Sequence, residues 1–157
     1  MPIVACKAVP YASMLTYAAA PRNMAFDWIR QQYDRVWIVS VTDAAIAPIF
    51  PTETGNIITL RFDDIDMDDP DGAKMLATGR YKPMSKQEAK KIVGFIRRAH
   101  GDPGNSLLLV NCMAGISRSG AIVTHAKDVC GISDDKFHAM NPRIIPNDYM
   151  LRLLSKA

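Results

Sequence analysis

The stretch that decides the fold runs from residue 106 to residue 120 and reads Ser106-Leu107-Leu108-Leu109-Val110-Asn111-Cys112-Met113-Ala114-Gly115-Ile116-Ser117-Arg118-Ser119-Gly120. Residues 106–110 form a short, mostly apolar run that is typical of a buried strand. From Ser119 to Val129 apolar residues recur at helical spacing. The intervening residues, Met113 to Ser117, must therefore turn the chain from a strand into a helix.

The remaining segments predict more units of the same kind. Strand patterns lie at residues 3–9, 36–41 and 57–62, and Ser85 with Glu88 forms a capping box that opens a helix ending near Gly101. Strands that alternate with helices predict an α/β fold with a central, mostly parallel sheet flanked by helices. We expect a single domain that covers residues 1–157.

The turn at residues 113–117 has the properties of an anion site. Its backbone N–H groups are free to point inward, and the following helix adds its positive N-terminal end. Arg118 contributes a planar fork of donors that keeps its charge. A free cysteine titrates near roughly 8.5, and such surroundings bring that value to about 3.5 to 7.5. The sequence therefore predicts a bound anion above a reactive thiolate at Cys112.

Two motifs carry a resemblance to a known family. Cys-x5-Arg within residues 110–120 looks like the signature loop of the cysteine-dependent protein tyrosine phosphatase superfamily, and the wording Ala-Gly-Ile-Ser-Arg-Ser is closest to its dual-specificity branch. The segment from Asn141 to Asn147 is similar to the Pro-x-Ile-x-Pro-Asn segment that leads into the last helix of these phosphatases. Asn147 is also a simple helix N-cap. The resemblance covers residues 57–155 and implies a cysteine-phosphatase-like fold.

The resemblance also implies roles for individual residues. Cys112 is the nucleophile of a phosphocysteine mechanism, and Ser119 helps the cysteine leave in the second step. The phosphoryl group is held by the loop residues Met113, Ala114, Gly115, Ile116, Ser117 and Arg118, and no cofactor or metal is needed. One position departs from the family: Asn111 stands where a histidine precedes the cysteine. This leaves open a catalytically weak or silent phosphate-binding pseudophosphatase.

A general acid is expected in the acidic run that follows the strand at residues 57–62. Strand alternation places Ile58, Leu60 and Phe62 on one face, and Asp64 continues that face. The acid of the family lies at the end of such a strand, so Asp64 is our first assignment, followed by Asp66 and Asp63. We expect a solvated loop for the other three carboxylates of the run, which are Asp68, Asp69 and Asp71.

A calcium loop is not expected in the same run. The calcium template needs a ligand where this chain has Pro70, and a glutamate where it has Thr78. No metal site is predicted. The insertion at residues 65–84 is longer than the family usually shows, and we expect it to act as a lid or recognition element.

The side chains of the loop indicate the class of substrate. The loop side chains of Met113, Ala114 and Ile116 are apolar, which favours a protein phosphomonoester, above all phosphotyrosine, with phosphoserine and phosphothreonine as further substrates. Relatives with the same loop act on phosphoinositides or RNA 5′ ends, and these alternatives stay open. A rhodanese-like sulfurtransferase or a cysteine hydrolase with a distant histidine fits less well, because Arg118 has no role in the hydrolase and Asp64 has none in the sulfurtransferase.

The composition indicates the kind of partner and the cellular compartment that fit this chain. The chain is 48% hydrophobic and 22% charged, and its net charge of +3 is too small to argue for nucleic acid. Three cysteines without zinc-like spacing fit a reducing cytoplasm. We expect no signal peptide and no membrane span. We interpret the basic residues of one segment as a solvated helix face: Lys82, Lys86, Lys90, Lys91, Arg97 and Arg98.

Overall fold

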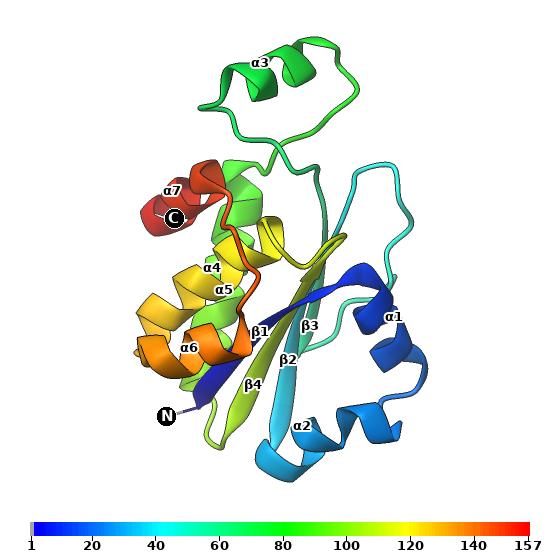
Figure 1. Ribbon diagram of the computed structural model, residues 1–157, viewed down its shortest axis with the longest axis vertical. Coiled ribbons are helices and arrows are strands. Elements are labelled where there is room, and N and C mark those ends of the chain that lie inside the picture. Colours follow the sequence, from blue (N-terminus) through cyan, green and yellow to red (C-terminus); the bar gives the residue numbers. More distant parts are fainter. Residues whose placement is uncertain (1) are drawn as a thin grey trace.

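The computed structural model describes residues 2–157 and has a four-stranded sheet at its centre (Figure 1). The strands lie in the order β1-β4-β2-β3, and all neighbouring pairs are parallel. The α/β fold predicted from the sequence is confirmed. The strands are β1 (Ile3–Pro10), β2 (Arg35–Thr42), β3 (Ile57–Arg61) and β4 (Ser106–Cys112).

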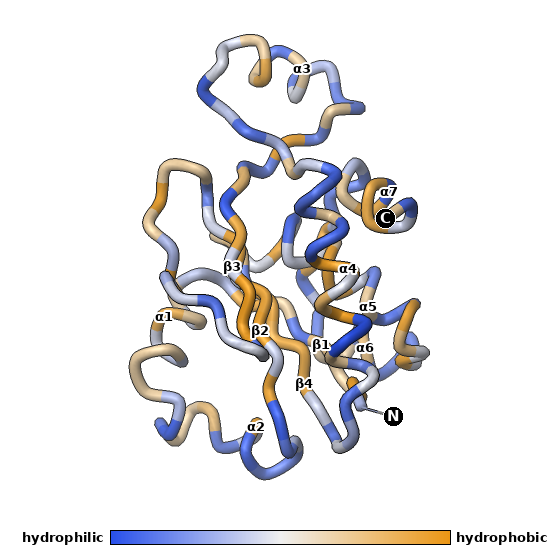
Figure 2. Tube along the Cα trace, turned by 180° about the vertical axis from the view of Figure 1, so that it is seen from behind, coloured by the Kyte–Doolittle hydropathy of each residue, from blue (hydrophilic) through white to orange (hydrophobic). Residues whose placement is uncertain are grey.

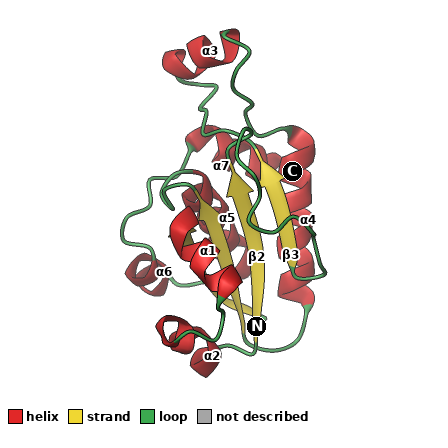
Figure 3. Cartoon of the chain, turned by 90° about the vertical axis from the view of Figure 1, so that its right-hand side faces the viewer, coloured by secondary structure: helices red, strands yellow, loops and turns green. Residues whose placement is uncertain are grey.

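Helices cover both faces of this sheet (Figure 3). On one face lie α1 (Tyr11–Ala19), the short 3-10 helix η1 (Met24–Phe26) and α2 (Asp27–Gln32). The other face carries α4 (Lys86–Gly101), α5 (Arg118–Cys130), α6 (Asp134–Met140) and α7 (Asp148–Lys156). The predicted capping box of α4 is present. The backbone amide of Glu88 donates to the hydroxyl of Ser85, and the backbone amide of Ser85 donates to the carboxylate of Glu88.

The strands separate two apolar cores, because successive side chains of a strand point to opposite faces. In β4, Leu107 and Leu109 pack with Met14 and Ile29 on the side of α1 and α2. Leu108 and every second residue after it in β4 pack instead against the helices on the opposite face of the sheet. Every residue of β4 is buried, as is typical of a strand inside a parallel sheet. Figure 2 shows the resulting concentration of apolar residues along the strands.

The insertion at residues 65–84 is not a loop throughout. It contains α3 (Pro70–Ala77), which Asp69 caps by accepting from the amide of Asp71. Pro70 occupies the first helical position, where its missing N–H costs nothing. The helix stands away from the body of the molecule in all three views (Figures 1 to 3). Asp68 and Asp69 lie in an exposed turn, as predicted, whereas the prediction of a loop is wrong for Asp71, because the cap and the proline together start a helix.

Because the strands are parallel, the loops that follow them lie at one edge of the sheet. The segments after β2, β3 and β4 all leave at the carboxyl ends, toward the insertion (Figure 3). Ligand sites of open α/β sheets form at this edge. Among the described residues, no helix combines the length and the apolar character needed to cross a membrane.

Candidate active site

The thiol of Cys112 lies at the floor of the loop that joins β4 to α5. The residue is 2% exposed. The amide of Gly115 donates to its sulfur at 3.3 Å, and the hydroxyl of Ser119 lies 3.1 Å from the same atom. Burial alone raises the pKa of this thiol, but hydrogen bonds from the Ser119 hydroxyl and from the amides of Ser119, Ile116 and Gly115 hold the pKa below its ordinary value. The loop thus stabilises a thiolate.

Gly115 allows the loop to take this shape. Its φ of 72° is in the left-handed region, and a Cβ atom would lie 2.6 Å from the backbone nitrogen of Pro10 and the carbonyl carbon of Val9. A side chain is therefore excluded by both strain and space. The amide of Tyr11 also donates to the carbonyl of Met113 at 3.1 Å. The end of β1 therefore fixes the loop from behind.

Arg118 is the first residue of α5, and the ends of two strands hold its side chain. The residue is 4% exposed. Nη1 donates to the carbonyl of Phe62 at 2.7 Å, and Nη2 pairs with the carboxylate of Asp43 at 2.8 Å. Nε is buried and has no hydrogen-bond partner within the described part of the chain. A buried donor of this kind is costly unless a ligand satisfies it.

Asp64 is the candidate acid that lies beside the loop. Its Oδ1 accepts from the hydroxyl of Ser117 at 2.9 Å and from the amide group of Asn147 at 3.0 Å. The other two candidates have different tasks. Asp63 accepts from the backbone amides of Ala44 and Lys82, at 3.2 and 2.7 Å. Asp66 accepts from the backbone amide of Asp68. Of the three, Asp64 alone is tied to the Cys112 loop.

The segment before α7 braces the outer side of this loop. The amides of Ile145 and Asn147 donate to the carbonyls of Ile116 and Ser117, each at 3.1 Å. Asn147 accepts from the amide of Met150 at 2.9 Å, which confirms the predicted N-cap. Its side-chain amide reaches both Asp64 and the carbonyl of Ile65. One residue therefore connects α7, the loop and the start of the insertion.

Asn111 does not brace the loop. It is fully buried, and its amide nitrogen lies 3.4 Å from the carbonyl of Val41 and 3.5 Å from that of Cys112. Both contacts are long for a hydrogen bond. Its Oδ1 has no partner among the residues that the structure describes. The side chain before Cys112 is thus directed at β2 and makes only weak contacts.

Asp43 is a site residue that the sequence reasoning missed. It follows β2 directly and reaches Arg118 across the sheet edge. Its position directly after a predicted strand could have indicated this role. The carboxyl ends of parallel strands lie at one edge of the sheet, where an acidic side chain can contact a basic one from a neighbouring loop. Ser119, Gly115 and Ile116, by contrast, lie around the sulfur of Cys112, whereas Ser117 and Arg118 are hydrogen-bonded to other residues.

Comparisons with known proteins give no match. A scan against protein-family models and a search of curated proteins both find none for this chain. In residues 2–157 the structure also shows no group of three or more histidine, cysteine, aspartate or glutamate side chains placed to hold a metal ion.

Proposed function

We propose that this chain is a cysteine-dependent phosphomonoester hydrolase of the dual-specificity-like branch of the protein tyrosine phosphatase superfamily. It removes phosphate from phosphotyrosine in proteins, and from phosphoserine and phosphothreonine as further substrates, through a phosphocysteine intermediate. No metal or cofactor takes part in this mechanism.

A single observation carries the proposal. The sulfur of Cys112 lies at the floor of the loop and accepts a hydrogen bond from the amide of Gly115. Arg118 follows the same loop, and its Nε is buried without a partner in the described chain. Hydrogen bonds to the sulfur favour the thiolate, and the free guanidinium donor favours an anion above it. A nucleophile and an anion trap in one loop are the two parts that phosphoryl transfer to a thiol requires.

The reaction has two steps, in which the same acid acts twice. The thiolate of Cys112 attacks phosphorus, the bond from phosphorus to the leaving oxygen breaks, and Asp64 gives that oxygen its proton. Asp64 then accepts a proton from water, which attacks the phosphocysteine and releases inorganic phosphate. The sulfur leaves as a thiolate, which the hydroxyl of Ser119 stabilises from 3.1 Å.

The rim of the loop favours an aromatic phosphate ester. Ile145 is bonded to the loop through its amide and is 73% exposed. The loop adds the half-buried side chains of Met113 and Ile116. An apolar rim of this kind suits the ring of a phosphotyrosine. All three cysteines are free, and because a reactive thiolate needs reducing surroundings, we infer that the protein works in the cytoplasm.

A second candidate is a phosphate-binding protein without catalysis. The observation that favours it is Asn111, whose contacts of 3.4 and 3.5 Å leave the loop without a firm brace beside the nucleophile. In that case Arg118 and the loop amides bind a phosphorylated partner, and Cys112 forms no covalent intermediate.

Steady-state hydrolysis of an aryl phosphate across pH, without added metal, separates the two candidates. We expect wild-type activity that Cys112→Ser abolishes, and a basic limb of the pH profile that Asp64→Ala removes. Asp66→Ala is the matched control, because Asp66 only accepts from a backbone amide within the insertion. A wild type no faster than Cys112→Ser would overturn the enzymatic proposal in favour of phosphate binding alone.

A further inference from the structure

Four basic side chains surround a hollow that the proposed mechanism does not use. The hollow has a volume of about 530 Å3 and lies between α4 and α7, two helices in direct contact. We call it the basic hollow. Its lining residues are Lys86, Lys90, Arg152, Leu153, Lys156 and Ala157. The first two belong to the segment that we had interpreted as a solvated face.

Like charges lie at helical spacing on both helices that border the basic hollow. Lys86 and Lys90 are four residues apart on α4, and Arg152 and Lys156 are four apart on α7. Like charges at this spacing destabilise a helix. Lys86 is also the first residue of α4, where the helix dipole is already positive. An anion between the two helices would offset all of these repulsions.

The side chains that line the hollow carry no negative charge. Within residues 2–157 the three lysines of the hollow form no ion pair, and no carboxylate side chain lines it. Arg152 alone has an acidic partner, which is Asp68 of the insertion. The apolar floor of Leu153 and Ala157 can receive the aliphatic part of a ligand. The recessed shape fits a peptide segment, whereas a membrane surface would require an exposed, open patch.

The basic hollow lies at the same end of the molecule as the candidate active site. α4 begins where the insertion returns to the body, on the side of the carboxyl ends of the strands (Figure 1). α7 is capped by Asn147, whose side-chain amide donates to Asp64. Asp68, the partner of Arg152, lies only four residues after Asp64. One extended substrate can therefore contact both regions.

We propose that the basic hollow is a docking site for an acidic segment of the polypeptide substrate; this proposal rests on the proposed phosphatase function. Carboxylates of that segment pair with Lys86, Lys90 and Lys156, and they compete with Asp68 for Arg152. The active-site loop then acts on a phosphorylated residue elsewhere in the same chain. Specificity for acidic substrates comes from this second contact and not from the loop itself.

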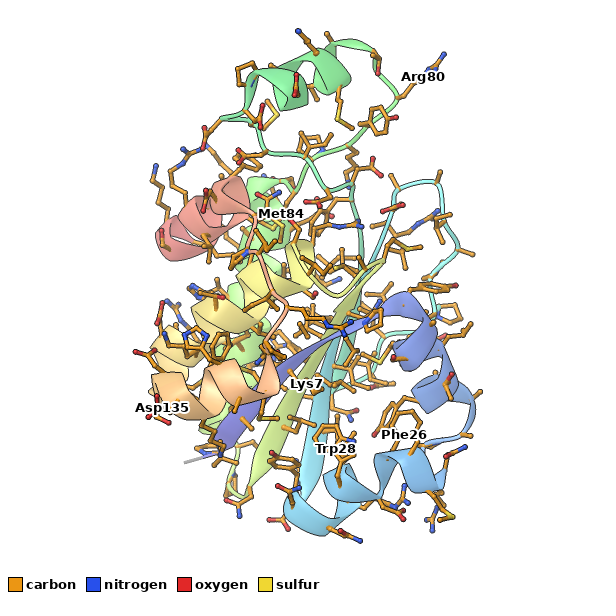
Figure 4. All side chains as sticks on the ribbon, in the orientation of Figure 1. Lys7, Phe26, Trp28, Arg80, Met84 and Asp135 are labelled. Atoms are coloured by element: carbon orange, nitrogen blue, oxygen red, sulfur yellow. The ribbon has the colours of Figure 1, made fainter. Side chains whose placement is uncertain are left out.

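Binding of a fluorescein-labelled oligoglutamate peptide, followed by fluorescence anisotropy, tests the docking directly. We expect the double variant Lys86→Gln/Lys90→Gln to weaken binding about tenfold. The matched control Lys74→Gln/Arg80→Gln removes the same charge from the insertion and should bind like the wild type. Figure 4 shows Arg80 at the outer tip of the insertion, pointing away from the body. Equal affinity of the two double variants would overturn the proposal.

Catalysis gives the second readout. The hollow variant should hydrolyse a phosphotyrosine peptide with an oligoglutamate tail about tenfold less efficiently, in kcat/KM, than the wild type, and an untailed aryl phosphate equally well. If the aryl phosphate is hydrolysed but the tail makes no difference, the docking site alone is wrong. If no aryl phosphate is hydrolysed, the proposed function fails, and the substrate role of the hollow fails with it. Preferential binding to phosphatidylserine vesicles over the peptide would also contradict the proposal.

Discussion

Removal of the carboxylate of Asp43 tests whether Arg118 must be held from β2. The guanidinium of Arg118 is 5% exposed, and its Nη2 lies 2.8 Å from Asp43, whose side chain is 38% exposed. Breaking a fully buried pair costs roughly 3–5 kcal/mol, and an exposed pair contributes less than about 1 kcal/mol. Since water can reach the Asp43 side of this pair, Asp43→Ala should lower the free energy of unfolding by about 1–2 kcal/mol.

The effect on activity should be larger than the effect on folding. Arg118 keeps its bond to the carbonyl of Phe62 but loses its second anchor, so its free Nε no longer has a fixed direction. Misplacement of a positioning group by about 1 Å costs up to roughly a hundredfold, and we expect kcat/KM for an aryl phosphate to fall roughly ten- to a hundredfold. Inhibition by inorganic phosphate should weaken in parallel.

The controls separate positioning from stability. Asp43→Asn keeps an oxygen that can accept from Arg118, so it should recover most of kcat/KM. Asp102→Ala removes an exposed pair with Arg35 elsewhere and should leave kcat/KM unchanged. Urea unfolding and steady-state kinetics measure the two quantities on the same preparations. If Asp43→Ala loses stability but keeps wild-type kcat/KM and phosphate inhibition, the role assigned to Asp43 is wrong.

Three further substitutions test other parts of the site. Gly115→Ala should lower the free energy of unfolding in urea by roughly 2–4 kcal/mol, because it adds left-handed strain to a backbone clash, whereas Gly55→Ala, with open space around it, should cost far less. Ser119→Ala removes a hydrogen bond that lowers the pKa of Cys112, so this pKa should rise. The acid limbs of the pH profiles of kcat/KM and of thiol alkylation by iodoacetamide should then move to higher pH. Acid limbs that do not move would contradict the role assigned to Ser119. Asp63→Ala frees two backbone amides at the base of the insertion and should cost about 1–3 kcal/mol in thermal or urea unfolding, yet keep the basic limb of the pH profile.

The sequence predicted those parts of the fold that depend on local residue patterns. The apolar run at residues 106–110 and the helical spacing after Ser119 correspond to β4 and α5, within one or two residues at each end. The capping box at Ser85 started α4 where expected. These features depend on neighbouring residues alone, so a single sequence contains them.

The parts that the sequence did not predict depend on contacts between distant residues. The position of β4 between β1 and β2 places the Cys112 loop beside the ends of β2 and β3, and only this order brings Asp43 to Arg118. The helix inside the insertion was missed because its short acidic start resembled a solvated loop, although Asp69 and Pro70 together are a helix start. Strand alternation ranked Asp64 above its neighbours, but its link to the loop segment depends on Asn147, which is distant in sequence.

The central claim, a covalent phosphoryl group on Cys112, can be measured by acid-quenching the enzyme during turnover of an aryl phosphate and locating bound phosphate by peptide mass spectrometry. We expect phosphate on the peptide that contains Cys112, in greater amount for Asp64→Ala because the water step is then slowed, and none for Cys112→Ser. Hydrolysis that proceeds without label on Cys112, or a wild type that neither hydrolyses the ester nor carries label, would contradict it.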